Sequence, residues 1–133
     1  MKWRWIPFAE LTAKELYDLL QLREDVFHLE QRCIYRDLDD ADIQARHLLG
    51  YHQEQLICYL RVGLQDEDLI VARVVVKAAF RRRGLGKVML SNTLQTLQQN
   101  YPGFGIVMSA QLEQEGFYSS LGFAPCGVPF LDA

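Results

Sequence analysis

The feature that most constrains the fold is a valine-rich apolar run that leads through a basic glycine turn into a helical pattern. Residues 69–76 include three consecutive valines, whose branching at Cβ favours extended backbone. Because apolar residues are nearly continuous in this run, we expect a strand covered on both faces. Residues 78–86 form the turn, and leucines then recur at helical spacing at Leu90, Leu94 and Leu97. The unit predicts one β-α-β crossover.

The rest of the chain predicts strands and helices in a mixed order. The N-terminal residues around Pro7 predict an edge strand, and Thr12 with Glu15 predicts a capping box that opens a helix over 13–29. Residues 30–44 are polar, which leaves a loop or a short second helix open. The other predicted elements are a hairpin of strands at 47–52 and 55–62, a strand at 104–110, a helix at 113–121 ended by Gly122, and a final extended segment.

Composition indicates one globular domain, residues 1–133, of ordinary apolar and charged content. A formal net charge of −3 argues against a nucleic-acid surface. The three cysteines are widely spaced and odd in number, which argues against a disulfide framework, and no zinc-ligand spacing is present, so we expect no bound metal. There is no signal-peptide pattern, and Arg73 and Lys77 interrupt the longest apolar stretch, so we expect a cytoplasmic protein without a membrane span.

The turn after the valine-rich strand has the chemistry of an anion cradle. A helix N-terminus offers unpaired N–H groups, and glycines at 84 and 86 open the backbone to a phosphate oxygen. Flanking arginines would add charge-assisted hydrogen bonds. A P-loop needs glycine where Arg81 stands and a hydroxyl where Val88 stands, and a dinucleotide fingerprint needs glycine in place of Met89. The segment therefore predicts a phosphate or pyrophosphate site of another kind.

The arrangement Arg-x-x-Gly-x-Gly resembles motif A of the GNAT superfamily of N-acetyltransferases, with a basic surface turn as the alternative. The resemblance implies that the loop binds the pyrophosphate of coenzyme A and that the preceding strand pairs with the pantetheine arm. The binding residues implied are Val74, Val75, Val76, Arg81, Arg82, Arg83, Gly84, Leu85, Gly86 and Lys87. The fold implied is the α+β (α/β) GNAT fold, a mixed and mostly antiparallel sheet with a β-α-β acetyl-CoA-binding core flanked by helices.

A second segment, residues 117–123, resembles motif B of the same family, Phe-Tyr-x-x-x-Gly-Phe. In that family the tyrosine lies at the thioester sulfur and is the usual candidate general acid, a role that falls here on Tyr118. A phenol can protonate or hydrogen-bond a departing thiolate. The alternative is that Tyr118 is a core aromatic residue on an amphipathic helix, but the two motifs in order favour the functional interpretation.

A narrower resemblance, from about residue 10 to the end, is to the ElaA-like branch of the GNAT proteins. It rests on the runs Leu19–Arg23, Val26-Phe27, Glu30-Gln31-x-Cys33-x-Tyr35, Arg46-His47 and Ser109–Gln111. The branch usually has proline where Ile34 stands, and it usually continues past the point where this chain ends. We therefore expect either a shortened chain or a strand supplied by a partner, and exposed sheet edges there would favour a homodimer.

The resemblance implies direct transfer of an acetyl group from acetyl-CoA to a primary amine of a small molecule or peptide. Candidates for the base are Glu30, His47 or an ordered water chain; the alternatives are a solvated carboxylate for Glu30 and a structural histidine for His47. Four aspartates could attract a cationic acceptor, although a solvated loop is the simpler interpretation: Asp37, Asp39, Asp40 and Asp42. The rival functions are a non-catalytic CoA-binding module and a nucleotide- or sulfate-binding scaffold.

Overall fold

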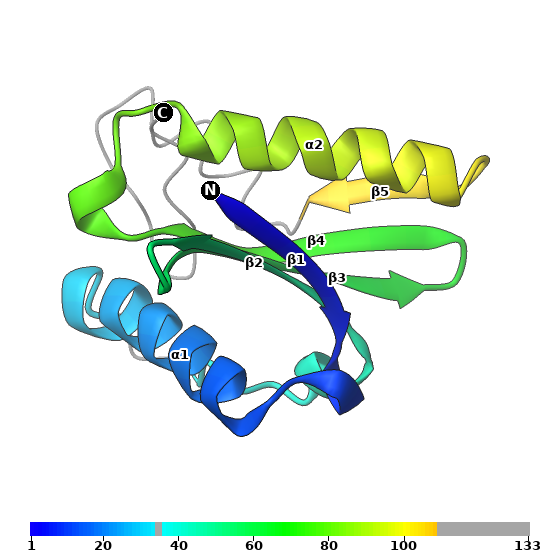
Figure 1. Ribbon diagram of the computed structural model, residues 1–133. Coiled ribbons are helices and arrows are strands. Elements are labelled where there is room, and N and C mark those ends of the chain that lie inside the picture. Colours follow the sequence, from blue (N-terminus) through cyan, green and yellow to red (C-terminus); the bar gives the residue numbers. More distant parts are fainter. Residues whose placement is uncertain (34–35, 109–133) are drawn as a thin grey trace.

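The computed structural model describes residues 1–33 and 36–108 as five strands on which two α-helices pack. The strands are β1 (Lys2–Pro7), β2 (Arg46–His52), β3 (Gln55–Gln65), β4 (Asp68–Val76) and β5 (Gly105–Met108). They lie in the order β1-β2-β3-β4-β5; the pairs among β1 to β4 are antiparallel, and β5 is parallel to β4. Figure 1 shows α1 (Ala13–Arg23) on one face of the sheet and α2 (Leu85–Asn100) on the other.

The helix on the first face opens with the capping box that the sequence predicts. Thr12 Oγ1 accepts from Glu15 N at 3.1 Å, and Thr12 N donates to Glu15 Oε1 at 2.9 Å. The helix then widens into a π-helical segment, η2 (Glu24–Glu30), so the predicted span of 13–29 holds although its second half is not α-helical. Apolar side chains of both segments pack on the sheet: Leu19, Leu22, Val26 and Phe27.

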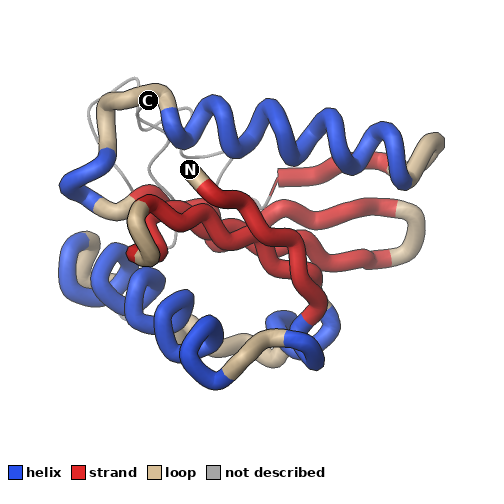
Figure 2. Tube along the Cα trace, viewed as in Figure 1, coloured by secondary structure: helices blue, strands red, loops and turns tan. Residues whose placement is uncertain are grey.

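The second face carries the larger core, between the sheet and α2. Its members from the helix are Met89 and Leu97, both buried, and those from the sheet include Leu60, Val71, Val74 and Val76. Because Val74 and Val76 lie in this core whereas Val75 packs toward α1, β4 is covered on both faces, which confirms the expectation from its continuous apolar sequence. Figure 2 shows this two-sided cover as helix, strand and helix layers.

A bulge interrupts β4 between Ala72 and Val75. Tyr59 pairs with Val75 but Arg61 pairs with Ala72, so two steps along β3 span three along β4. Arg73 lies within the bulge at a φ of 56°, a left-handed conformation that is rare for a residue with a Cβ. Within the described part of the chain, β4 pairs with β5 only from Asp68 to Val71, before the bulge.

The hairpin of β2 and β3 and the edge strand β1 were both predicted from the sequence. β1 pairs with β2 alone among the described strands, and Pro7 is its last residue, as expected for an edge. The polar region before β2 contains a 3-10 turn, η3 (Ala41–Gln44), instead of a full second helix. None of the helices in the described ranges is long and apolar enough to cross a membrane. The helix predicted at 113–121 and the last strand lie outside the described residues.

Candidate active site

The end of β4 offers backbone groups away from β3. Lys77 N donates to Ile57 O of β3 at 2.7 Å, so the odd-numbered residues at this end direct their backbone toward β3. Since alternate residues of a strand point their N–H and C=O groups to opposite sides, Val74 and Val76 direct theirs to the other side. In the described ranges no strand pairs with that side after Val71. This edge is where the predicted pantetheine-binding backbone lies.

The glycine turn leads into α2, and no side chain caps the first turn of this helix. Gly84 is the N-cap residue, at a φ of 79°, which a residue with a side chain adopts only with strain. A Cβ built on Gly84 would meet no atom within 4 Å, so the space beside it is open. The N-terminus of α2 therefore presents backbone donors and the positive end of the helix dipole to an accessible region.

Three of the four predicted basic ligands surround this helix start and face solvent. Arg82, Arg83 and Lys87 are exposed. The guanidinium of Arg83 lies 5.2 Å from the centre of the Phe80 ring, whose other neighbour is the ring of His52 at 5.6 Å between centroids. Leu85 is half-buried and Gly86 is buried. The structure thus brings the predicted glycines and exposed cations together at one end of the sheet.

Arg81, the fourth basic residue, is oriented differently. Only 10% of its side chain is exposed. Its Nε donates to Val76 O at 2.9 Å, and both terminal nitrogens donate to the Glu30 carboxylate at the end of η2, Nη2 to Oε2 at 3.0 Å. Glu30, with a third of its side chain exposed, is one of the two predicted bases. The structure therefore joins a predicted base and a predicted cofactor ligand in one ion pair.

The other predicted base, His47 on β2, is fully buried. Its Nε2 lies 2.9 Å from the Asp42 carbonyl, which can only accept, so Nε2 is the protonated nitrogen. Its Nδ1 lies 2.5 Å from the Tyr59 hydroxyl, which donates to it. Burial lowers the pKa of His47, and the nearby charges of Arg23 and Arg61 lower it further, so the ring is held neutral. These contacts favour the structural alternative for His47.

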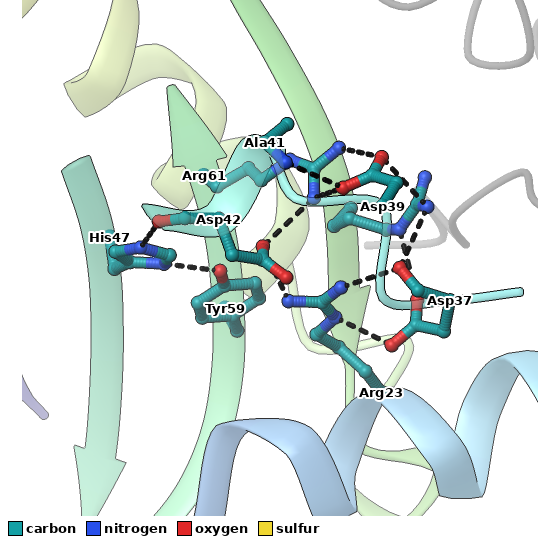
Figure 3. A network of polar contacts seen from close by, with 9 residues as sticks. Arg23, Asp37, Asp39, Ala41, Asp42, His47, Tyr59 and Arg61 are labelled. Atoms are coloured by element: carbon teal, nitrogen blue, oxygen red, sulfur yellow. Dashed lines mark hydrogen bonds and ion pairs between the residues drawn. The ribbon is translucent and has the colours of Figure 1, made fainter. Parts of the chain in front are cut away.

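A largely buried network of three arginines and three aspartates, of which Asp39 is the exposed member, lies beside His47 (Figure 3). The arginines come from α1, β3 and β4, and the aspartates come from the segment before β2. Arg23 Nε donates to Asp37 at 2.9 Å and Nη1 donates to Asp42 at 2.8 Å. The remaining ion pairs join Arg61 to Asp39 and Asp42, and Arg73 to Asp37 and Asp39. The network ties the segment 37–42 to the sheet and to α1.

Electrostatics in the network favour the charged forms of Asp39 and Asp42. Burial would raise the pKa of Asp42, but the hydrogen bonds and charges of Arg23 and Arg61 outweigh it and hold that pKa below its ordinary range. The pKa of Asp39 lies below its ordinary range for the same balance of burial against Arg61 and Arg73. Burial raises the pKa of Tyr59, so its hydroxyl stays protonated and can donate to His47.

Comparison with known proteins identifies the family of this chain. Residues 15–133 match the family of acetyltransferase (GNAT) domains. This chain belongs to the GNAT acetyltransferase family. Protein ElaA of Escherichia coli (strain K12) is 37% identical over 130 residues, which cover 94% of this chain and 85% of that protein. The chain is therefore a member of the ElaA-like branch, and it is an acyltransferase.

Solved structures agree with this assignment of the GNAT fold. The crystal structure of Escherichia coli ElaA matches with a TM-score of 0.80 at 35% identity, over 91% of this chain and 85% of that one. An acyl-CoA N-acyltransferase from Pseudomonas aeruginosa matches with a TM-score of 0.79 at 34% identity, over 92% and 88%. A predicted acetyltransferase from Clostridium acetobutylicum shares the fold, with a TM-score of 0.63 at 14% identity over 92% and 88%.

One interpretation of the acidic segment of this GNAT chain was wrong. Three of its four aspartates do not belong to a solvated loop, because they form ion pairs with buried arginines that offset their charge. Of these four aspartates, Asp40 alone is exposed and makes none of the ion pairs found among the described residues. The signal that sequence reasoning missed is the set of arginines inside otherwise apolar helix and strand patterns: Arg23, Arg61 and Arg73.

The remaining predicted site residue, Tyr118, lies outside the described residues, so its role stays a prediction. Within residues 1–33 and 36–108, no three side chains of His, Cys, Asp or Glu gather where they could hold a metal ion. The described part of the site is thus a backbone edge, a helix start and exposed cations, an arrangement whose chemistry suits an anion beside an extended chain.

Proposed function

We propose that this GNAT protein transfers the acetyl group of acetyl-CoA to a primary amine of a small molecule or peptide, by direct attack in a ternary complex. The observation that carries the proposal is that the open edge of β4 leads, through the glycine turn, to the uncapped N-terminus of α2. An extended amide-bearing arm fits the first, and a diphosphate fits the second. Coenzyme A carries both groups in that order.

The residues present fit such a ligand. Val74 and Val76 offer N–H groups to the pantetheine amides and to the thioester carbonyl. The first turn of α2 offers N–H groups to the diphosphate, and Arg82, Arg83 and Lys87 supply positive charge. The structure of the Clostridium acetobutylicum protein is described with acetyl-CoA, which supports the same ligand for a chain of the same fold.

In the proposed reaction the amine lone pair attacks the thioester carbonyl carbon. A C–N bond forms, the C–S bond breaks, and coenzyme A leaves as a thiolate. Tyr118 then protonates the thiolate or stabilises it by donating a hydrogen bond. Holding the amine and thioester together supplies much of the rate.

The amine must also lose a proton, and we assign this proton to an ordered water chain. His47 is sealed inside the fold with both ring nitrogens hydrogen-bonded, so an acceptor cannot reach it. Both carboxylate oxygens of Glu30 accept hydrogen bonds from Arg81. Water is the third alternative that the chemistry allows.

Titration calorimetry with acetyl-CoA tests the cofactor. We expect binding of acetyl-CoA and of CoA, and no competition by ATP, because ATP lacks the pantetheine arm that pairs with β4. Absence of both heat and thermal stabilisation at millimolar acetyl-CoA would reject the proposal. Displacement of bound CoA by ATP would support a general phosphate-binding scaffold instead.

Thiol release on a panel of primary amines tests the reaction. Acetyl-CoA binding without transfer to any amine would support a non-catalytic CoA-binding module. We expect Tyr118→Phe to lower turnover more than it weakens acetyl-CoA binding, because a phenyl ring keeps the shape but cannot donate to the sulfur. An equal loss of turnover and affinity would reject the role assigned to Tyr118.

A further inference from the structure

Glu30 and Arg81 connect two parts of the fold that are 51 residues apart in sequence. Glu30 is the last residue of the π-helical segment η2, and Arg81 follows the end of β4. Every nitrogen of the Arg81 guanidinium has an acceptor: Nε has Val76 O, and the two terminal nitrogens have the Glu30 carboxylate. This fork holds the guanidinium in one plane between the strand end and η2.

This arrangement is unlike that of the neighbouring basic residues. Arg82 and Arg83 are exposed beside the start of α2, whereas the Arg81 side chain is nine-tenths buried and neutralised by a carboxylate. A diphosphate bound at the helix start would therefore meet Arg82 and Arg83 and not a free charge on Arg81. The geometry leaves Arg81 to act on the backbone, through Val76 O.

Val76 O belongs to the β4 edge that the pantetheine arm would follow. A carbonyl oxygen has two lone pairs, and Arg81 Nε takes one at 2.9 Å, which leaves the other for a pantetheine amide. Because Arg81 is also the first residue after the turn Ala78–Phe80, its fixed side chain holds the chain direction from β4 into the glycine turn. The position of η2, where Gln31 N donates to Val26 O at 2.9 Å, sets where the Glu30 carboxylate lies.

We propose that Glu30 is a positioning residue for coenzyme A and not the catalytic base: its carboxylate holds the Arg81 guanidinium on Val76 O and so fixes the β4 edge and the glycine turn for binding. The inference rests on the proposed function, because it concerns the same ligand site. It gives η2, on the opposite face of the sheet from α2, a part in cofactor affinity that acts through Arg81.

The sign of one binding measurement separates this inference from its rivals. On electrostatics alone, Glu30→Gln removes a negative charge near an anion site and should strengthen binding of acetyl-CoA. A freed Arg81 that turned to the diphosphate would strengthen it as well. If Glu30 positions the loop, Glu30→Gln instead weakens acetyl-CoA binding about tenfold, because the fork to Arg81 loses its charged acceptor.

Glu24→Gln is the matched control. Glu24 lies at the first position of η2, is exposed, and makes none of the ion pairs found in the described residues. The same charge is lost on the same segment, so we expect its dissociation constant for acetyl-CoA to stay within about twofold of the unmodified protein. Arg81→Lys keeps the charge but not the planar fork, and we expect it to weaken binding about as much as Glu30→Gln.

The pH profile of turnover at saturating acetyl-CoA distinguishes positioning from proton transfer. A positioning role leaves the shape of the profile unchanged in Glu30→Gln and raises KM for acetyl-CoA more than it lowers kcat. Loss of the acidic limb with unchanged acetyl-CoA affinity would make Glu30 the base and overturn the inference. Unchanged or tighter binding in Glu30→Gln would overturn it too while leaving the acetyl-CoA function intact. Failure of the unmodified protein to bind acetyl-CoA would reject both.

Discussion

Arg73 in the β4 bulge donates from Nε to Asp37 Oδ1 at 2.9 Å and from Nη2 to the Asp37 carbonyl at 3.0 Å. The two residues are 36 positions apart in sequence. Left-handed backbone at Arg73 costs about 1–2 kcal/mol, and the bulge persists because the arginine reaches the buried aspartate from there. The same contact therefore holds the strand irregularity next to the candidate cofactor edge and the polar segment that precedes β2.

Asp37→Ala should be strongly destabilising. The substitution removes the carboxylate that both Arg23 Nε and Arg73 Nε share, and leaves Arg23 with Asp42 and Arg73 with Asp39. Breaking a buried ion pair by removing one partner costs about 3–5 kcal/mol. Urea unfolding followed by circular dichroism measures this loss. Asp40→Asn is the control, because Asp40 is exposed and asparagine tolerates its left-handed backbone; we expect a change within about 0.5 kcal/mol. Similar losses in the two variants would contradict a buried network.

Acid should remove the contribution of Asp39 and Asp42 to the free energy of unfolding. Both folded-state pKa values lie below the ordinary value of 3.8, because arginine contacts outweigh burial. A lowered folded pKa gives stability that is fully present above the unfolded pKa and is lost as pH falls through the folded pKa. We therefore expect the free energy of unfolding to fall below about pH 4, and to fall less steeply in Asp42→Asn, when both are measured in urea across pH 2–6.

A second acid transition should come from His47. Burial lowers its folded pKa below the ordinary 6.5, so at pH values between the two pKa values the unfolded chain binds a proton and the folded chain does not. The contribution to stability is full above about pH 6.5 and is lost as pH falls through the folded pKa. Between pH 7 and pH 5 the unfolding free energy should decline in the unmodified protein and decline less in His47→Gln. An identical slope in the two proteins would show that folding does not lower the pKa of His47.

Much of the fold could be predicted because its signals are local. The capping box at Thr12, the valine run of β4 and the leucine spacing of α2 each depend on residues close in sequence, and the structure confirms all three. The π-helical turn of η2 could not be predicted in this way. Its side chains have the same apolar spacing as an α-helix, and the difference lies in backbone hydrogen bonds such as the one from Gln31 N to Val26 O, five residues earlier.

The candidate site also contains local features that the sequence predicts and long-range contacts that it does not. Gly84 and the exposed cations of the turn were predictable, since a glycine turn before a helix is a local pattern with a direct electrostatic meaning. Pairing of Arg81 with Glu30, and of Arg73 with Asp37, joins residues far apart in sequence. Nothing in the spacing of a charged residue says whether its partner is water, a ligand or another buried side chain.

Cys58 should resist alkylation in the folded protein. Its side chain is fully buried in β3, and burial raises the pKa of its thiol to about 12, so almost no thiolate is present at pH 8. Treatment with iodoacetamide followed by peptide mass spectrometry should find Cys58 unmodified in native protein and modified in urea. Rapid modification under native conditions would mean that β3 opens to solvent.

Gly84→Ala should separate stability from cofactor binding when it is compared with Gly103→Ala. Both glycines have left-handed backbone, with φ of 79° and 87°, and a Cβ at either would meet no atom within 4 Å. The cost of each substitution is therefore conformational, about 1–2 kcal/mol, and urea unfolding should find the two similar. Gly84 opens α2 at the proposed diphosphate site, whereas Gly103 follows the other end of that helix. Only Gly84→Ala should weaken acetyl-CoA binding in calorimetry, because its Cβ enters the space that a phosphate oxygen would take; equal weakening by Gly103→Ala would place the diphosphate elsewhere.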